Sequence, residues 1–130
     1  MIVVDTSALM AIVMEEPTAD SCSDCLALAD PVLISAGTLT EALIVSRMRN
    51  RQRQMEELIQ TVAPQVIAVT EVFARGAANA YETWGEGLHR AALNFGDCFA
   101  YALAKERGCP LLFVGRDFAA TDVLTALPET

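Results

Sequence analysis

Four acidic residues are the first candidates for chemistry in this 130-residue sequence. Each follows a short apolar run or stands near the start of a helical pattern: Asp5, Glu41, Asp97 and Asp117. Four carboxylates gathered in one place repel one another and cannot all stay ionised without a compensating cation. Mg²⁺ and Mn²⁺ prefer oxygen ligands, and such an ion activates water and stabilises the leaving oxygen when a phosphodiester is hydrolysed. The four acids therefore indicate metal-assisted hydrolysis.

The apolar runs have the length and composition of buried strands. Strands are predicted at residues 1–4, 32–35, 66–69 and 111–114, with a weaker fifth at 122–124. Helices are predicted at residues 7–16, 18–29, 37–48, 55–62, 71–84 and 96–108. Alternating strands and helices indicate a parallel sheet covered on both faces. We predict one α/β domain over residues 1–130, a three-layer α/β/α sandwich with a mainly parallel sheet of four to five strands.

This architecture brings the acids together. Ligands of open parallel sheets bind beyond the carboxyl ends of the strands. Asp5 follows the first strand and Asp117 the fourth, whereas Glu41 and Asp97 lie near the starts of helices. Because helices start at the edge where strands end, all four acids are expected at one rim.

Helix capping is a second interpretation of the same acids. Residues 5–7 (DTS) are three good N-cap residues, and residues 38–41 (TLTE) match a capping box with Glu41 at its third helical position. Asp97 stands where the helix dipole favours a negative charge, and Asp117 is a turn acid. Position alone leaves capping and metal binding open for each.

Charge and hydropathy argue against a general nucleic-acid-binding protein, a membrane protein and a secreted protein. The net charge is −8, which argues against general electrostatic binding of nucleic acid; two divalent cations would halve it. No stretch approaches the roughly 20 apolar residues of a membrane span, and residues 1–5 (MIVVD) lack a basic signal-peptide start. We expect a cytoplasmic protein without membrane contact.

The sequence offers little for thiol or histidine chemistry. Its four cysteines are most simply buried thiols. Cys22 and Cys25 form a C-x-x-C, which also occurs in redox and zinc sites, but they fall in a predicted helix and no second pair completes a metal site. His89 is the only histidine; we expect it on a surface loop.

Two further patterns have more than one interpretation. Arg47, Arg49, Arg51 and Arg53 stand two apart and form the only basic run. A solvated helix junction is favoured, with a surface that guides the RNA backbone as the alternative. Tyr81 and Trp84 are more typical of packing or dimer contacts than of base stacking.

Four segments carry a family resemblance. They are residues 3–9 (VVDTSAL), 35–42 (SAGTLTEA), 93–104 (LNFGDCFAYALA) and 112–123 (LFVGRDFAATDV). In this order they resemble the PIN-domain family, most of all its VapC-type toxins of bacterial toxin–antitoxin pairs. The resemblance spans nearly the whole chain.

The resemblance implies a PIN-like fold and a Mg²⁺- or Mn²⁺-dependent endoribonuclease, the toxin of a type II toxin–antitoxin system. It also implies a homodimer, an RNA substrate and a cognate antitoxin protein. An amphipathic antitoxin helix is expected to lie against the apolar faces of residues 9–14 and 43–48.

Roles for single residues follow from the same resemblance. Asp5, Glu41 and Asp97 match the most regular acids of the family and Asp117 a less regular fourth, as catalytic and metal-binding residues; Asp122 matches a further metal-binding acid, and Ser7, Thr38 and Asn94 match polar residues that hold the site. Arg116 replaces an acid or Asn that the family often has before Asp117, and it is a candidate contact for RNA phosphate.

Two other functions remain as alternatives. One is a catalytically inactive PIN-like module that binds RNA or protein. The other is an aspartyl phosphoryl-transfer domain with Asp5 as nucleophile. The aspartyl phosphatases usually carry a second Asp two residues later, where this chain has Ser7, and Lys105, the only lysine, falls within a predicted helix.

Overall fold

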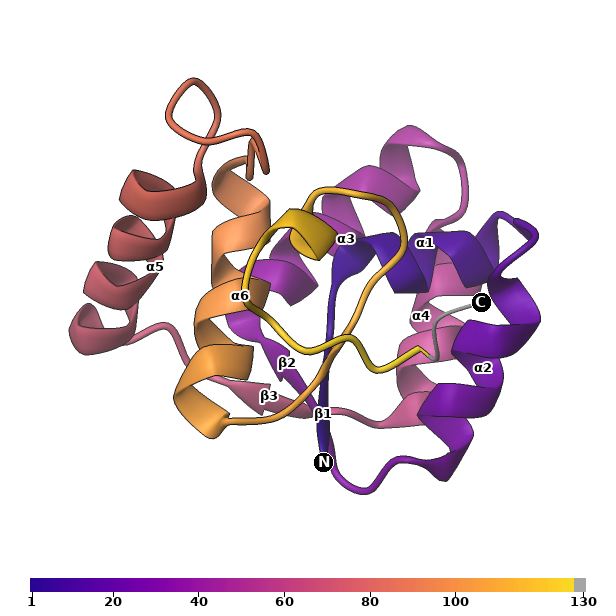
Figure 1. Ribbon diagram of the computed structural model, residues 1–130. Coiled ribbons are helices and arrows are strands. Elements are labelled where there is room, and N and C mark those ends of the chain that lie inside the picture. Colours follow the sequence, from indigo (N-terminus) through magenta and orange to yellow (C-terminus); the bar gives the residue numbers. More distant parts are fainter. Residues whose placement is uncertain (128–130) are drawn as a thin grey trace.

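The computed structural model describes residues 1–127 (Figure 1). Its elements in chain order are β1 (Ile2–Val4), α1 (Thr6–Val13), α2 (Ala19–Leu28), β2 (Val32–Ser35), α3 (Ala36–Met48), α4 (Gln52–Val62), β3 (Gln65–Ile67), α5 (Glu71–Trp84), α6 (Phe95–Arg107), β4 (Leu111–Leu112) and the 3₁₀ turn η1 (Phe118–Ala120). Strands alternate with helices along the chain, as the sequence predicts.

The four strands form one parallel sheet in the order β3-β2-β1-β4. Val3 in β1 lies beside Leu33 of β2 and Leu111 of β4. Since the strands are parallel, their carboxyl ends meet at one edge, which is the upper rim in Figure 1. The first turns of α1 and α3 lie at this rim because each helix starts directly after its strand.

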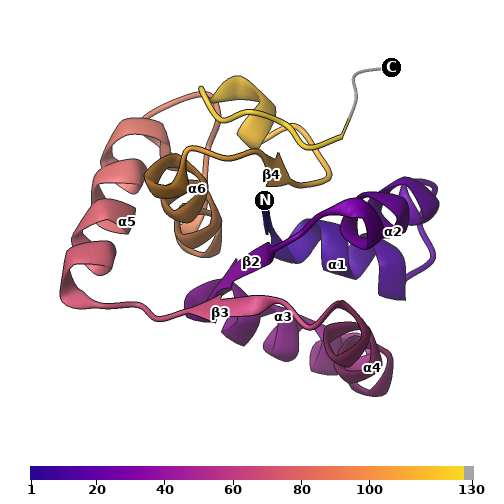
Figure 2. The ribbon, with the colours of Figure 1, turned by 90° about the horizontal axis from the view of Figure 1, so that it is seen from below.

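Strand side chains alternate between two cores. Val3, Leu33 and Leu111 pack with α5 and α6. The neighbouring strand residues, among them Val4 and Ile34, pack with the helices α1 to α4. Figure 2 shows these two helical layers on opposite sides of the sheet. The predicted three-layer α/β/α sandwich is confirmed.

The sheet is smaller than predicted at its edges. β3 ends at Ile67, so Ala68 and Val69 are not in the strand, and Val66 is exposed because β3 is an edge strand. β4 contains only two residues. The predicted fifth strand at 122–124 is wrong: the chain there forms no strand, and the next residue, Thr125, makes only an isolated bridge to Leu111 of β4. One bridge is too little backbone pairing to extend a sheet.

The cysteines and the basic run, which the sequence analysis singled out, have structural surroundings. All four cysteines are free thiols, and burial raises the pKa of both Cys22 and Cys25 in α2; a redox cysteine instead needs a lowered pKa. The basic run falls at the junction of α3 and α4, where Arg53 pairs with Glu57. Within residues 1–127, no helix is long and apolar enough to cross a membrane.

Candidate active site

Asp5 lies at the end of β1 and is only 2% exposed. Its Oδ2 atom caps α1 by accepting hydrogen bonds from the Ser7 backbone N–H (3.0 Å) and the Ser7 hydroxyl (2.7 Å). The Ser7 hydroxyl oxygen also accepts the N–H of Val114, just beyond β4 (3.0 Å). The other carboxylate oxygen, Oδ1, is buried without a hydrogen-bond partner among the described residues. Asp5 is therefore fixed by one oxygen, and the other is left for a further partner.

Asp97 lies in the first turn of α6 and is 9% exposed. Its Oδ2 atom accepts the Asn94 backbone N–H (3.0 Å), while the Asn94 side chain accepts the Asp97 N–H (2.9 Å). This reciprocal capping box holds the carboxylate by one oxygen only, as Ser7 holds Asp5. Both acids thus serve as caps and still have an oxygen available for binding.

Glu41 reaches the same rim from α3. Its helix begins at Ala36 with Ser35 as the N-cap, so the predicted capping box with Glu41 at the third helical position is wrong. The Glu41 carboxylate instead lies against the backbone of Gly96, in the space that any Cβ at this position would fill. Gly96 directly precedes Asp97, and its missing side chain lets the two acids approach.

The two remaining acids have different surroundings. Asp117 is exposed in the turn before η1, where its side chain makes no capping hydrogen bond, and its charge acts on Asp97. Asp122 is not brought to this rim: its carboxylate accepts hydrogen bonds from the Tyr101 hydroxyl and from Lys105 (3.1 Å). Those partners occupy both of its oxygens.

The pKa values show how unfavourable the cluster is without a cation. The pKa of Asp5 is raised to about 7, mainly by burial and to a smaller extent by the charges of Asp97 and Glu41, while the two Ser7 hydrogen bonds act in the opposite direction. Burial also raises the pKa of Asp97 to about 6, with contributions from Glu41, Asp117 and Glu86. Each of the four acids, Asp5, Glu41, Asp97 and Asp117, is thus close enough to at least one other for their charges to interact.

The donor set fits a hard cation. No three acidic, histidine or cysteine side chains of residues 1–127 are arranged closely enough to hold a metal ion as they stand. Like charges without a cation keep apart, so an open arrangement is expected. The unpaired Oδ1 of Asp5 and the unpaired hydroxyl of Thr38, both buried, are oxygen atoms of the kind that Mg²⁺ and Mn²⁺ prefer.

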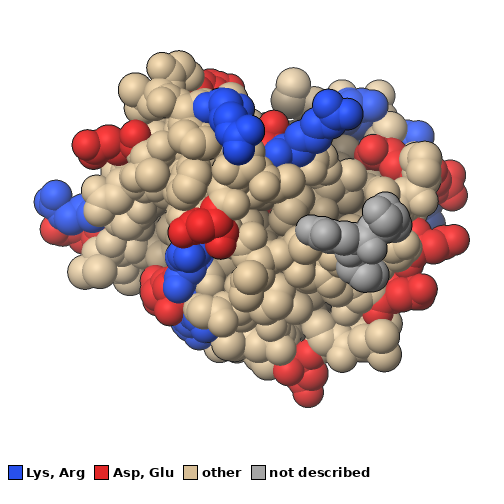
Figure 3. Space-filling model, in the orientation of Figure 1, with Lys and Arg blue, Asp and Glu red and all other residues tan. Residues whose placement is uncertain are grey.

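Basic side chains flank the rim. Figure 3 shows two groups of them at the top of the view, on the side to which the strands point, whereas acidic side chains gather along the edge formed by α2. Arg116 is exposed beside Asp117, and Arg90 is exposed in the loop before α6. Basic side chains are thus present on this side of the molecule despite the net charge of −8.

Comparison with known proteins assigns the family. The family model of the PIN domain matches residues 2–124. The chain belongs to the PIN-domain family. Within it, this PIN domain is 41% identical to VapC ribonuclease Mb0640 of Mycobacterium bovis, over 97% of this chain and 99% of that protein. It is 42% identical to ribonuclease VapC of Mycolicibacterium smegmatis, over 93% and 96% of the two chains.

Solved structures show the same fold. VapC20 of Mycobacterium tuberculosis, a toxin that cleaves the sarcin–ricin loop, superimposes on this PIN domain with a TM-score of 0.79 at 19% identity, covering 98% of this chain and all of that one. A toxin–antitoxin complex from Klebsiella pneumoniae gives a TM-score of 0.72 at 17% identity, covering 99% and 100% of the two chains. The resemblance found in the sequence is confirmed.

The other predicted contacts are placed as follows. Trp84 donates to the Tyr101 hydroxyl (2.9 Å) and contacts His89 edge-on, so Trp84 is a packing residue. His89 is half-buried, with its Nδ1 accepting the Ala91 N–H. Among the faces expected to meet an antitoxin, Leu9 to Val13 are largely buried in the core, whereas Ile44 and Met48 of α3 are exposed.

Proposed function

We propose that this PIN domain is an endoribonuclease that uses Mg²⁺ or Mn²⁺ held by Asp5, Glu41, Asp97 and Asp117 and serves as the toxin of a type II toxin–antitoxin pair. The similarity to VapC ribonucleases over nearly the full length supports the reaction. The observation that carries the site is the Asp5 carboxylate, buried with one unpaired oxygen among other acids. An acid so placed either keeps its proton or takes a cation from outside the chain.

A divalent cation, when bound, supplies the positive charge and Lewis acidity that phosphodiester hydrolysis needs. The protein prepares the ligands. Ser7 orients Asp5, and Asn94 orients Asp97. The absence of a side chain at Gly96 leaves space for the Glu41 carboxylate. Arg116, which is exposed next to Asp117 in the chain, would contact an RNA phosphate beside the acids. With all the acids present and their oxygens available, catalysis is favoured over an inactive binding module.

The same proposal includes the partners. A cytoplasmic toxin of this kind is held inactive by a cognate antitoxin, and it acts as a homodimer. The exposed Ile44 and Met48 of α3 offer an apolar surface for an amphipathic antitoxin helix. The toxin–antitoxin complex of similar fold from Klebsiella pneumoniae supports such a partner.

RNA cleavage is the first test. Purified protein is incubated with total cellular RNA and Mn²⁺ or Mg²⁺, and wild type is compared with Asp97→Asn and with Asp24→Asn, an exposed acid on α2. We expect discrete fragments from wild type and Asp24→Asn, and a rate lower by about a thousandfold for Asp97→Asn, as for the loss of several kcal/mol of metal assistance. Equal cutting by all three proteins would contradict the assigned site.

Metal binding is the second test and does not depend on the RNA. Mn²⁺ at about 100 times its dissociation constant stabilises a folded protein by roughly 2.7 kcal/mol. At pH 8 the melting temperature of wild type and Asp24→Asn should rise with Mn²⁺, and that of Asp97→Asn much less. A protein that binds Mn²⁺ through these acids but cuts no RNA in the absence of antitoxin would favour the inactive binding module.

A further inference from the structure

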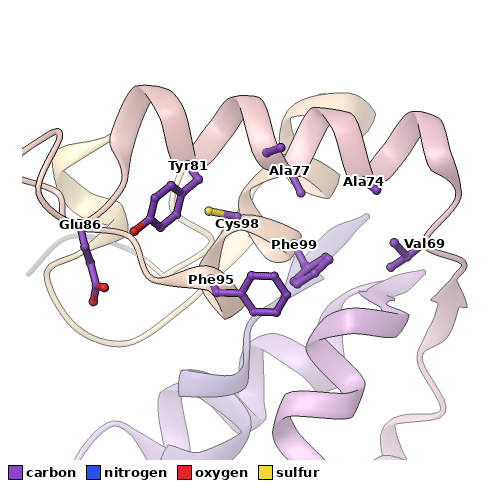
Figure 4. A pocket seen from close by; sticks show the side chains of 9 residues that line it. Val69, Ala74, Ala77, Tyr81, Glu86, Phe95, Cys98 and Phe99 are labelled. Carbon is purple, nitrogen blue, oxygen red and sulfur yellow. The ribbon is translucent and has the colours of Figure 1, made fainter.

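A hollow of about 600 Å³ lies between α5 and α6. Figure 4 shows Phe95 and Phe99 in its middle and Val69 at one end, with Tyr81 and Glu86 at the other. Its walls are mainly carbon, and Glu86 is the only charged residue among those that line it. A negatively charged wall repels phosphate, so the hollow fits a flat, largely apolar group that carries hydrogen-bond donors.

Phe95 is the unusual residue of this hollow. It is the first residue of α6 and is 78% exposed. Its ring meets Phe99 edge-on at 5.1 Å, and Phe99 in turn stacks on Phe73 of α5 at 6.5 Å. The ring is therefore supported from one side while most of its surface faces solvent. An exposed, braced aromatic ring is the arrangement on which single-stranded nucleic acids stack their bases.

The hollow lies beside the acidic rim, because Cys98 in its wall directly follows Asp97 in α6. Phe95 stands two residues before Asp97 in the same helical turn. From the other end, the charge of Glu86 is near enough to contribute to the raised pKa of Asp97. A nucleotide whose phosphate lies at the acids can thus place a neighbouring base in the hollow.

We propose that this hollow is a nucleobase pocket, in which one unstacked guanine of the RNA substrate lies against Phe95 with its Watson–Crick edge toward Glu86. This inference rests on the proposed ribonuclease function and adds a substrate preference to it. Guanine presents two adjacent donors, N1–H and the N2 amino group, which match the two oxygens of a carboxylate. Adenine and cytosine pair one amino donor with an acceptor nitrogen, and uracil has one N–H between two carbonyls, so each sets an acceptor against Glu86.

The base preference at the cut tests the proposal. Total RNA is digested with wild type, Phe95→Ala and Glu86→Gln, and the new ends are sequenced. Leu28→Ala is the control because Leu28 is also a largely exposed apolar residue but lies on α2, in the opposite helical layer. We expect wild type and Leu28→Ala to cut next to guanine.

The two pocket variants should fail in different ways. Phe95→Ala should cut more slowly on the order of tenfold, as when one base–aromatic stack is lost. Glu86→Gln should lose the enrichment of guanine while sites without guanine are cut at the wild-type rate. A merely structural role of Glu86 would change the rate at every site alike and leave the base preference intact, which would overturn the proposal.

Two further outcomes separate this inference from the proposed function. If wild type cuts RNA and both variants keep its rate and its base preference, the nucleobase-pocket proposal is contradicted and the proposed ribonuclease activity is supported. If wild type cuts no RNA with either metal, both fail. If Phe95→Ala lowers the molar mass in light scattering and slows cutting without altering the base preference, the hollow is an interface between protein chains, and the base pocket is overturned.

Discussion

Two carboxylates at α6, one within the helix and one packed against it, have opposite surroundings. Asp97, in the first turn of α6, is buried among other acids, and its pKa is raised to about 6. Asp122 contacts Tyr101 and Lys105 further along that helix, and these partners lower its pKa. Asp122 has a structural role, because both its hydrogen-bond donor, Tyr101, and its cation, Lys105, belong to the chain. The rim acids lack a cation partner among residues 1–127, so without metal the folded state favours protons on Asp5 and Asp97.

The largest expected effect is on the pH dependence of stability. Without metal, the folded protein keeps a proton on Asp5 up to about pH 7, whereas an unfolded chain releases it near the ordinary value of 3.8. Raising the pH through this interval therefore lowers the free energy of unfolding, by on the order of 4 kcal/mol for Asp5 alone at about 1.4 kcal/mol per pKa unit. Thermal unfolding in a chelator at pH 5 and pH 8 measures the larger part of this loss, roughly 3 kcal/mol, because the unfolded chain has already released the proton at pH 5.

Asp5→Asn is the variant that sharpens this prediction. Asn caps helices about as well as Asp, so the cap on α1 is kept while the ionisable group is removed. The loss of stability between pH 5 and pH 8 should become clearly smaller than in wild type. A wild-type stability that rises over the same interval would mean that the rim acids are not strained by burial and repulsion.

The second prediction concerns the space around Glu41. In Gly96→Ala the new methyl group overlaps the Glu41 carboxylate, so the carboxylate must shift from its place beside Asp97. We expect RNA cleavage to fall by roughly a hundredfold, the upper range for disturbing groups that orient metal ligands. Gly76→Ala in α5 is the matched control, because a Cβ there meets nothing within 4 Å.

Thermal unfolding accompanies the cleavage assay for both glycine variants. Gly76→Ala should be slightly more stable, since alanine is favoured over glycine in helices by up to about 1 kcal/mol. Unchanged cleavage by Gly96→Ala would remove Glu41 from the active site.

The third prediction concerns the group that orients Asp5. Ser7→Ala removes the hydroxyl that donates to Asp5 and accepts the Val114 N–H. Cleavage should fall by roughly tenfold or more, as for other residues that orient a metal ligand. Ser46→Ala is the control: this buried serine on α3 donates to the Leu43 carbonyl (3.1 Å), away from the acids. A similar loss of activity in both variants would indicate a general packing defect.

The positions of Asp5 and Asp97 could be predicted from the sequence because helix capping and metal binding both favour acidic residues at helix starts. A carboxylate placed to cap a helix at the carboxyl edge of a parallel sheet already points to the ligand-binding edge. Asp5 and Asp97 follow this rule: one oxygen of each accepts hydrogen bonds at a helix start, and the other remains for a ligand. Local spacing therefore suffices for these two residues.

Other features depend on contacts between distant segments and could not be predicted from spacing. Asp122 looks like a further rim acid in the sequence, but the chain after η1 turns back along α6 and brings it to Lys105. The role of Gly96 depends on where Glu41 of another helix lies. The lone glycine before Asp97 is the only local signal, since a helix start does not by itself require one.

The smallest expected effect is that of Asp122→Asn, and it has the opposite pH dependence to that of Asp5. Because the folded state lowers the pKa of Asp122, its contribution is present above the unfolded value and is lost as the pH falls through the folded value. Its carboxylate and Lys105 are about half exposed, so the contribution at pH 7 should be about 1 kcal/mol or less and should shrink at high salt.

Unfolding at pH 7 and at pH 3 measures this contribution, and RNA cleavage should stay at the wild-type rate because the carboxylate is engaged away from the rim. The reverse result, abolished cleavage with unchanged stability, would make Asp122 a metal ligand, as the family resemblance implies. In that case the Tyr101 and Lys105 contacts would have to break when metal binds, and the contrast between the two carboxylates along α6 would be lost.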